Sequence, residues 1–254
     1  MKNEHTKVAW ITGGGTGIGK ELTKLLANKG WTIVISGRRL DKLNEVKKFK
    51  KDKIVPIQLD ISSKTQCKNV IKKILDKFKS IDLVFLNAAA YNPGHLDFSN
   101  LSSLENIIRV NITGQLNCLS FLMPHLKKKR NGKIVFVSSP AGFRGLPNAG
   151  IYGVTKSAIT FLAESLHIEM LKFNIKVQVV HPGFVKTPMT DKNDFPMPFL
   201  MTSADAAKRI YKKLSSNDFE IYFPKRLIWP MKLLQILPYK IYFFVMKRIT
   251  KFAS

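Results

Sequence analysis

Residues 8–19 read VAWITGGGTGIG, and this stretch decides how the chain begins to fold. The apolar run at 8–12 predicts a buried strand, and residues 17–28 predict the helix that follows it. Glycines at 13, 17 and 19 lie at the junction. Such a turn lets the backbone approach a pyrophosphate, and the N–H groups and dipole of the helix start favour phosphate. Because ordinary turns use glycine too, the position between strand and helix is what predicts a nucleotide site.

The rest of the chain alternates short β-branched runs with helical stretches, which is typical of βαβ units and a mainly parallel sheet. Further strands are expected at 32–36, 53–59, 83–87, 133–137, 177–181 and 219–223, and longer helices at 101–128 and 152–172. No internal repeat or low-complexity linker interrupts the pattern. We therefore expect an α/β fold: one Rossmann-like, doubly wound parallel sheet flanked by helices, formed by residues 1–224. Residues 225–254 are expected to be a basic amphipathic extension of the same domain.

Composition narrows the function classes. The 254-residue chain has 42 basic and 17 acidic residues and a net charge of +25, but no nucleic-acid-binding motif is present. Most of the basic residues are lysines, which we expect on solvated helix faces such as 47–53 and 68–79. Cys67 and Cys118 lack disulfide or metal spacing, and no apolar signal segment precedes the first strand. A cytoplasmic protein without a metal site and without a nucleic-acid partner is expected.

The end of the second strand bears on cofactor choice. Gly37 stands where an NAD-dependent enzyme usually has a carboxylate for the ribose hydroxyls, and Arg38 and Arg39 follow it. Because a guanidinium pairs with a 2′-phosphate that a carboxylate would repel, the sequence favours NADP(H). The two arginines can alternatively just begin a basic helix. Asp60, after the third strand, is placed either to accept a bond from the adenine amino group or to cap a helix or turn.

A catalytic group is indicated by Tyr152 and Lys156, which lie one helical turn apart and so share a helix face. Ser139 lies thirteen residues before the tyrosine. A phenol and an ammonium beyond a nucleotide site predict hydride and proton transfer. A tyrosine and lysine at this spacing can also be an ordinary solvated pair on a helix.

Several segments in register give the chain, from residue 7 to about 223, a resemblance to the classical short-chain dehydrogenase/reductase family. The matching segments are residues 12–19 (TGGGTGIG), Asp60, 87–90 (NAAA), 110–114 (VNITG), 138–139 (SS), 152–156 (YGVTK) and 182–187 (PGFVKT). One departure is Ala89, where the family often has glycine. The extra methyl group lies close to the expected cofactor.

The resemblance implies four catalytic residues. Tyr152 would give its proton to a carbonyl oxygen, which near neutrality needs its pKa to fall by roughly 2–3 units from about 10. Lys156 would supply the positive charge for that fall and hold the nicotinamide ribose. Ser139, chosen over Ser138 by the family's spacing, would donate a hydrogen bond to the substrate oxygen. Asn111 would help hold a water that passes protons to the lysine.

The resemblance also implies a set of cofactor-binding residues, in which Val185 and Thr187 would touch the nicotinamide carboxamide. The full set is Gly13, Gly15, Thr16, Gly17, Ile18, Gly19, Arg38, Arg39, Asp60, Ile61, Asn87, Ala88, Tyr152, Lys156, Val185 and Thr187.

Two late segments bear on the substrate and partners. Residues 188–203 are rich in Met, Phe and Pro, which suits either an apolar lid over a hydrophobic substrate or a loop that packs on its own domain. Residues 225–254 contain seven basic residues and no acidic one. Thirty residues after the last strand favour a homodimer over the tetramer in which many family members pair their last strands.

Pro238 is placed to begin a helix in this tail. One side would carry Ile241, Phe244, Val245, Arg248, Ile249 and Phe252, and another Lys240, Lys247 and Lys251. This pattern is typical of a basic amphipathic helix on an anionic membrane surface. Prolines and lysine interrupt the apolar stretch too early for a membrane span. The alternative is a helix packed over the substrate pocket or a partner subunit.

The function expected from these features is an NADPH-dependent carbonyl reductase or alcohol dehydrogenase. Its substrate would be a hydrophobic or lipid-like ketone or aldehyde, with Tyr152 as general acid, and the enzyme would be free in the cytoplasm or attached to a membrane. Two alternatives stay open. One is a 3-oxoacyl-carrier-protein reductase, whose acidic carrier would suit the basic surface. The other is a non-catalytic, NADP-sensing protein at a membrane surface.

Overall fold

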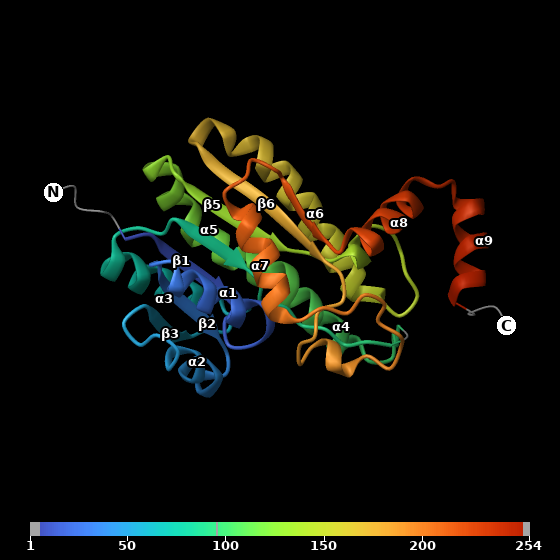
Figure 1. Cartoon of the computed structure of the whole chain (residues 1–254), viewed down its shortest axis with the longest axis horizontal. Helices are drawn as coiled ribbons and strands as arrows, with labels where there is room; N and C mark the ends of the chain where they lie inside the picture. Colours follow the sequence, from blue (N-terminus) through green and yellow to red (C-terminus); the bar gives the residue numbers. More distant parts are fainter. Residues whose placement is uncertain (1–5, 95, 251–254) are drawn as a thin grey trace.

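The computed structural model describes residues 6–94 and 96–250 and shows a seven-stranded, all-parallel sheet (Figure 1). The strands are β1 (Val8–Thr12), β2 (Thr32–Gly37), β3 (Ile54–Gln58), β4 (Leu83–Leu86), β5 (Gly132–Val137), β6 (Ile175–Pro182) and β7 (Glu220–Phe223). Their order in the sheet is β3-β2-β1-β4-β5-β6-β7. The winding direction therefore reverses between β1 and β4, and ligands of such sheets bind where the strand order reverses.

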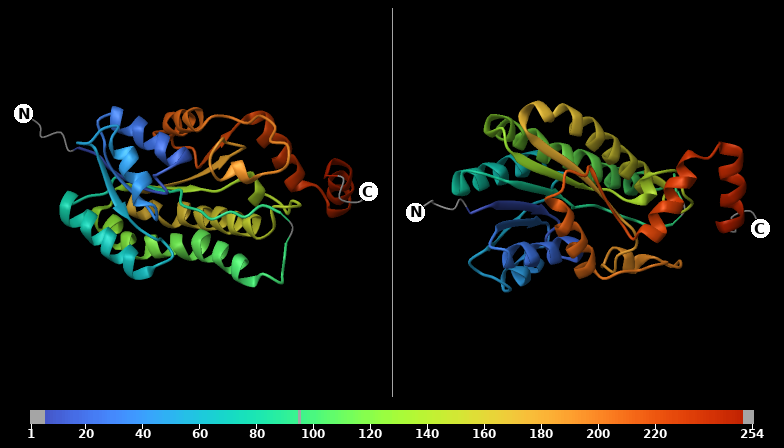
Figure 2. Two further views of the ribbon diagram at one scale, coloured as in Figure 1. Left: turned by 90° about the horizontal axis from the view of Figure 1, so that it is seen from below. Right: turned by 45° about the horizontal axis from the view of Figure 1, so that its top comes forward.

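Helices cover both faces of the sheet, as Figures 1 and 2 show. One face carries α1 (Gly17–Asn28), α2 (Leu40–Lys47) and α7 (Ser203–Leu214), and the other carries α3 (Lys64–Phe78), α5 (Gly114–Lys129) and α6 (Gly150–Glu169). Successive side chains of a strand pack into different apolar cores on the two faces of the sheet. In β2, Ile33 and Ile35 belong to the first core and Val34 to the second. The predicted doubly wound α/β fold is confirmed.

The predicted single helix over 101–128 is wrong in one respect. The chain forms α4 (Leu101–Ile108), then a π-helical turn (Arg109–Thr113), and then α5. The wider turn contains Asn111, which is fully buried and bonded to the backbone of Ala90. A tertiary contact therefore overrides the regular helical period, as π-turns often do at functional positions.

Other boundaries differ from the prediction by a few residues. Only the first residue of the basic segment 47–53 is helical, because α2 ends at Lys47 and residues 48–53 turn into β3. α6 ends at Glu169, and Leu171–Phe173 forms a separate 3₁₀ turn. The lysines of segment 68–79 do lie on α3, up to its end at Phe78.

The tail forms two helices, α8 (Lys225–Ile236) and α9 (Tyr239–Thr250). The helix predicted to start at Pro238 corresponds to α9, although Lys251 and Phe252 lie outside the described residues. α8 was not predicted, because Pro230 lies inside it. Figures 1 and 2 show α8 beside the end of the sheet and α9 standing away from it. Across residues 6–94 and 96–250, no helix is both long and apolar enough to cross a bilayer.

Candidate active site

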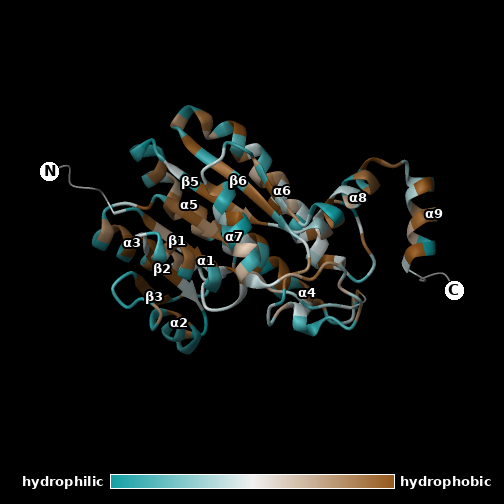
Figure 3. Cartoon of the chain, in the orientation of Figure 1, coloured by the Kyte–Doolittle hydropathy of each residue, from teal (hydrophilic) through white to brown (hydrophobic). Residues whose placement is uncertain are grey.

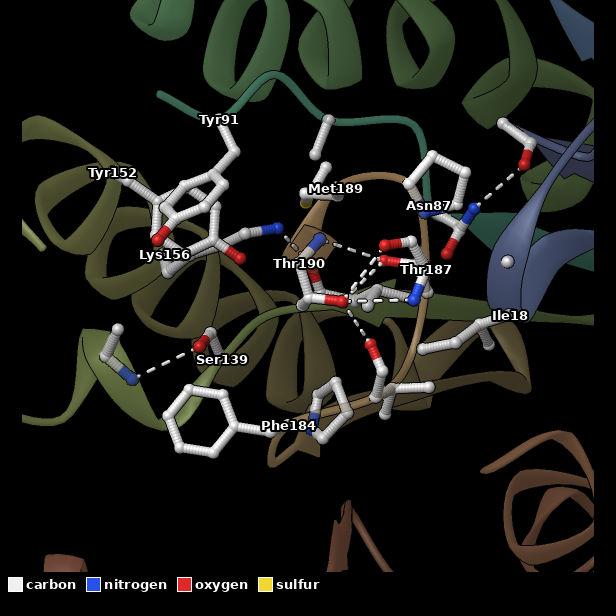
Figure 4. A pocket seen from close by; sticks show the side chains of 18 of the residues that line it. Ile18, Asn87, Tyr91, Ser139, Tyr152, Lys156, Phe184, Thr187, Met189 and Thr190 are labelled. Atoms are coloured by element: carbon white, nitrogen blue, oxygen red, sulfur yellow. Dashed lines mark hydrogen bonds between the residues drawn. The ribbon is translucent and has the colours of Figure 1, made fainter. Parts of the chain in front are cut away.

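A cleft of about 940 Å³ lies at the carboxyl ends of the strands, where the sheet order reverses (Figure 4). Its volume is in the range of ligand pockets. The loops after β1, β2, β3, β4, β5 and β6 line it, together with residues of segment 188–203 and of the tail. Every predicted site residue lines the cleft except Gly19 and Asn111, which lie behind its wall.

The glycine loop packs so closely that side chains are excluded. Gly13 has a φ of +68°, and a Cβ there would lie 2.8 Å from Nδ2 of Asn87. A Cβ on Gly19 would lie 2.4 Å from the carbonyl oxygen of Gly13. The Asn87 amide donates to the carbonyl oxygens of Thr12 and Gly13, both at 3.1 Å. Asn87 therefore fixes the loop from behind while it also borders the cleft.

The start of α1 is open to an anion. Its N-cap residue, Thr16, makes no side-chain capping hydrogen bond, and no acidic residue lies in the first turn. Thr16, Gly17 and Ile18 border the cleft at this point. Uncapped N–H groups at the positive end of a helix dipole suit a phosphate. The loop and helix start therefore fit a dinucleotide pyrophosphate.

The next part of the cleft is basic. Arg38 and Arg39 border it, and among the described residues neither guanidinium forms an ion pair. Arg39 is also the N-cap residue of α2. The alternative prediction, that the arginines begin a helix, therefore also holds for Arg39. Lys42, which the sequence did not single out, borders the same space and pairs with Glu45 at 2.7 Å. These cations fit a ribose phosphate.

Asp60 lies in a turn that it stabilises and also at the border of the cleft. Its Oδ1 accepts hydrogen bonds from the backbone N and the hydroxyl of Ser62, at 2.9 and 2.7 Å, so it shapes a turn before α3. The residue also borders the cleft together with Ile61. Its contact with an adenine stays a prediction.

Three of the four predicted catalytic residues, Ser139, Tyr152 and Lys156, meet on one side of the cleft (Figure 4). Lys156 is only 2% exposed; its Nζ donates to the Val137 carbonyl at 2.8 Å and lies 5.4 Å from the centroid of the Tyr152 ring. The Ser138 hydroxyl donates to the backbone carbonyl of Lys156 at 2.8 Å. The Ser139 hydroxyl accepts from the backbone N of Ala141 at 3.2 Å and faces the pocket. Ser139 is thus the serine beside the phenol.

The pKa of Tyr152 shifts in the direction opposite to the prediction. Burial raises the pKa of this phenol above its usual value of 10, against a smaller lowering by a hydrogen bond with the Ser139 side chain. Burial lowers the pKa of Lys156 to about 8. The predicted fall in the tyrosine pKa is therefore wrong for this structure. The ammonium lies against the Val137 carbonyl rather than at the phenol oxygen, so loss of solvation dominates.

Asn111 joins two parts of the site from behind. Its Oδ1 accepts from the backbone N of Ala90 at 2.7 Å, and its Nδ2 donates to the Ala90 carbonyl and to the Thr155 hydroxyl, both at 3.0 Å. The side chain therefore ties the loop after β4 to the helix that carries Tyr152. Its predicted part in holding a water stays a prediction.

Sequence reasoning missed Tyr91. Its ring packs edge-on against Tyr152, with the centroids 4.7 Å apart, and its hydroxyl donates to Oδ1 of Asn193 in segment 188–203 at 2.8 Å. An isolated bridge between Val185 and Met201 joins the chain near the two ends of that segment. Only the motif-like segment 87–90 just before it could have drawn attention to Tyr91.

Part of the cleft lining is apolar. The large apolar side chains in it include Leu146, Phe184, Met189, Phe195, Leu227 and Met231. Two of them, Leu227 and Met231, come from α8, so the tail contributes to the pocket wall. Over the part of the chain that the structure describes, no three His, Cys, Asp or Glu side chains gather as metal ligands.

Comparison with known proteins identifies the family of the chain. The family model described as short chain dehydrogenase matches residues 7–196. An uncharacterized oxidoreductase of Myxococcus xanthus is 31% identical over 241 residues, which cover 94% of this chain and 95% of that protein. The 3-oxoacyl-[acyl-carrier-protein] reductase FabG of Thermotoga maritima is 34% identical over 189 residues, covering 73% of this chain and 77% of that protein.

A solved structure, that of ElxO with NADP bound, superposes with a TM-score of 0.76 at 28% identity and covers 85% of this chain and 97% of that one. The chain therefore belongs to the short-chain dehydrogenase family, and the resemblance noted from its motifs is confirmed. It is an oxidoreductase of a family that uses NAD(P).

Proposed function

We propose that this protein is an NADPH-dependent reductase of a hydrophobic ketone or aldehyde, which also runs in the oxidative direction. One observation carries the proposal. A single cleft joins two arginines without ion-pair partners among the described residues, an open helix start, the group Ser139–Tyr152–Lys156, and several large apolar side chains.

The choice of NADP(H) rests on the basic end of the cleft. Arg38, Arg39 and Lys42 surround the place beside β2 where a 2′-phosphate would lie, and Gly37 leaves no carboxylate to repel it. ElxO, the structural relative with NADP bound, supports the same choice. When bound, the nicotinamide nucleotide supplies the hydride.

The protein's own residues supply the proton and position the substrate. Ser139 donates a hydrogen bond to the carbonyl oxygen as negative charge develops there. Tyr152, on the same side of the cleft, transfers its phenolic proton to that oxygen. The Lys156 ammonium, 5.4 Å from the centroid of the Tyr152 ring, would favour the phenolate that this leaves. The raised pKa of Tyr152 keeps the phenol protonated before the reaction.

A second candidate is a 3-oxoacyl-carrier-protein reductase. The net charge of +25 would attract an acidic carrier protein, and FabG of Thermotoga maritima is a relative. The apolar side chains of the cleft suit an acyl chain in both cases. A non-catalytic, NADP-sensing protein is less well supported, because all three side chains expected to act on a carbonyl are present and meet in one cleft.

We also propose a homodimer that forms through the outer side of α5 and α6. Exposed apolar side chains gather on these helices: Leu116, Val154, Phe161 and Ile168. Burial of such a surface against a second copy would remove it from water. Sedimentation of the full chain measures the mass of the assembly.

The test is NADPH oxidation with carbonyl compounds of increasing chain length, and with 3-oxoacyl groups on a carrier protein. We expect kcat/KM to rise with chain length. Tyr152→Phe should lower kcat by about 10²-fold or more, because the proton donor is lost, while NADPH still binds. Tyr211→Phe, on α7 outside the cleft, is the matched control and should leave turnover unchanged.

Other results would contradict the proposal. Turnover that survives Tyr152→Phe would show that the phenol is not the proton donor. A preference for short polar ketones removes the hydrophobic substrate. A large preference for carrier-bound over free thioesters selects the carrier-protein reductase instead.

A further inference from the structure

The two tail helices expose an unusual amount of apolar surface. We call residues 225–250, which form α8 and α9, the tail hairpin. Eight large apolar side chains of the hairpin each expose half or more of their surface: Trp229, Leu233, Ile236, Tyr239, Ile241, Phe243, Phe244 and Ile249. Figure 3 shows hydrophobic ribbon running from α8 through the connection into α9, at the end of the molecule. A patch of this kind marks a contact surface.

The body of the protein covers only the inner sides of these helices. On α8, Ile228 is buried, whereas Trp229, Leu233 and Ile236 follow one another at helical spacing on the open side. On α9, Tyr242 and Met246 face the body. The apolar side predicted from the sequence, with Ile241 and Phe244, is not the packed side.

The positive charge of the hairpin indicates which kind of partner this surface can bind. Residues 225–250 contain six basic residues, Lys225, Arg226, Lys232, Lys240, Lys247 and Arg248, and no acidic residue. Lys232 pairs with Glu220, and among the described residues none of the other five forms an ion pair. Aromatic and aliphatic side chains interleaved with unpaired cations complement an apolar layer bordered by negative groups.

Arg144 holds the hairpin in its place. Its guanidinium donates to the carbonyl oxygens of Leu234, Gln235 and Leu237 at the end of α8, at 2.8, 3.1 and 2.5 Å. It also lies 4.8 and 4.1 Å from the ring centroids of Tyr239 and Tyr242. These contacts satisfy carbonyl groups that a helix end leaves free.

The hairpin also borders the reaction cleft. Leu227 and Met231 of α8 and Ile249 and Thr250 of α9 line the same cavity as Tyr152. Arg144 lies in the segment between Ser139 and Tyr152, so the hairpin is attached close to the catalytic group. Whatever binds the outer side of the hairpin therefore lies next to the mouth of the cleft.

We propose that the tail hairpin docks on the surface of an anionic lipid bilayer, with the cleft opening toward the lipid. The exposed aromatic and aliphatic side chains insert at the boundary between headgroups and acyl chains. Lys240, Lys247 and the other unpaired cations contact the negative headgroups. Entry of a substrate from the lipid phase rests on the proposed function, whereas the docking itself does not.

The test uses the full chain and two kinds of vesicle, pure phosphatidylcholine and phosphatidylcholine mixed with phosphatidylglycerol. We expect co-sedimentation with the mixed vesicles that weakens as salt is added. Lys240→Glu/Lys247→Glu should weaken this binding about 30-fold or more, since each cation near the surface contributes about 1 kcal/mol. Lys68→Glu/Lys73→Glu makes the same charge change on α3, at the other end of the molecule, and should change binding less than threefold.

A fluorescence measurement tests the apolar part. Trp10 is fully buried in the sheet and Trp31 packs against its core, whereas Trp229 is 59% exposed on α8. The emission should shift to shorter wavelength when mixed vesicles are added, and Trp229→Phe should remove that shift. Trp229→Ser/Phe244→Ser should weaken vesicle binding at least tenfold while turnover of a soluble carbonyl compound stays unchanged.

Three results would overturn the docking. The first is no vesicle binding, and the second is an equal loss of binding in the two double charge variants. The third is a dimer that Trp229→Ser/Phe244→Ser dissociates without any vesicle binding, which would assign the surface to a second copy. The Tyr152→Phe variant is expected to lose turnover but still to bind vesicles. Vesicle binding by this variant therefore tests the docking independently of the proposed reaction.

Discussion

The nucleotide cradle and the tail hairpin are held together in opposite ways. In the cradle, the Gly13 and Gly19 backbones and the Asn87 amide lie so close together that a single added methyl group would collide with a neighbour. In the hairpin, the Arg144 guanidinium contacts the rings of Tyr239 and Tyr242 of α9, and the Tyr242 hydroxyl donates to the carbonyl of Gly145. The hairpin leaves large side chains open to solvent.

This difference in packing matches the different requirements of a reaction site and of a contact surface. A site that aligns a hydride donor with a carbonyl needs fixed atoms, and close packing supplies them. A surface that meets a fluid layer needs exposed side chains and only a few anchoring contacts. We therefore expect equivalent substitutions to have large effects in the cradle and small, local effects in the hairpin.

Gly19→Ala should produce the largest effect. The new Cβ would lie 2.4 Å from the carbonyl oxygen of Gly13, which is backbone and cannot swing aside. We expect a loss of about 3 kcal/mol in unfolding free energy, as for an overpacked core, despite the better helix propensity of alanine. NADPH affinity should fall with it, because the loop must shift. Urea unfolding and NADPH titration measure both quantities.

The matched control is Gly145→Ala beside the hairpin. A Cβ at Gly145 would meet nothing within 4 Å, so stability and NADPH affinity should stay unchanged. Equal effects of the two substitutions would show that the cradle is not packed more rigidly than the hairpin attachment.

The cradle was also the more predictable of the two regions. The strand at 8–12 and the helix at 17–28 have the bounds that the sequence indicated, because a buried parallel strand and a glycine turn leave local signals. The shared helix face of Tyr152 and Lys156 was predictable from their spacing, whereas the place of Ser139 was implied by the family resemblance. Cofactor contacts of these residues stay predictions.

The misses have a shared physical cause, which is contact between segments distant in sequence. The π-turn at Asn111 depends on bonds to Ala90 and Thr155, and the raised pKa of Tyr152 depends on burial. α8 was missed because Pro230 is unfavourable inside an isolated helix, yet the burial of Ile228 and the bonds of Arg144 stabilise it.

Lys156→Met should have an intermediate effect that depends on pH. Burial lowers the pKa of Lys156 to about 8 in the folded chain, against 10.5 for the ordinary side chain. Between these pH values the unfolded state binds more protons, so the unfolding free energy of the wild-type protein rises with pH. Relative to Lys156→Met, it should rise by about 2 kcal/mol from pH 8 to pH 10.

Urea unfolding of both proteins without nucleotide, at several pH values, measures this difference. Lys133, whose pKa burial also lowers to about 8, is present in both proteins, so its contribution cancels. A difference that stays flat across this range would show that the bond from Lys156 to the Val137 carbonyl compensates for burial of the charge.

Arg144→Ala should have the smallest effect on global stability. The substitution removes the bonds to Leu234, Gln235 and Leu237 and the contacts with two tyrosine rings, but all of these belong to the hairpin. We expect a loss below about 1 kcal/mol in global unfolding free energy and faster tryptic cleavage within α9, because the hairpin opens locally. Arg144→Lys should behave similarly, since an ammonium cannot reproduce the planar fork of donors. If either variant instead lowers the midpoint temperature of the cooperative unfolding transition by several degrees, the hairpin unfolds together with the sheet as one unit. The contrast between the two regions would then disappear.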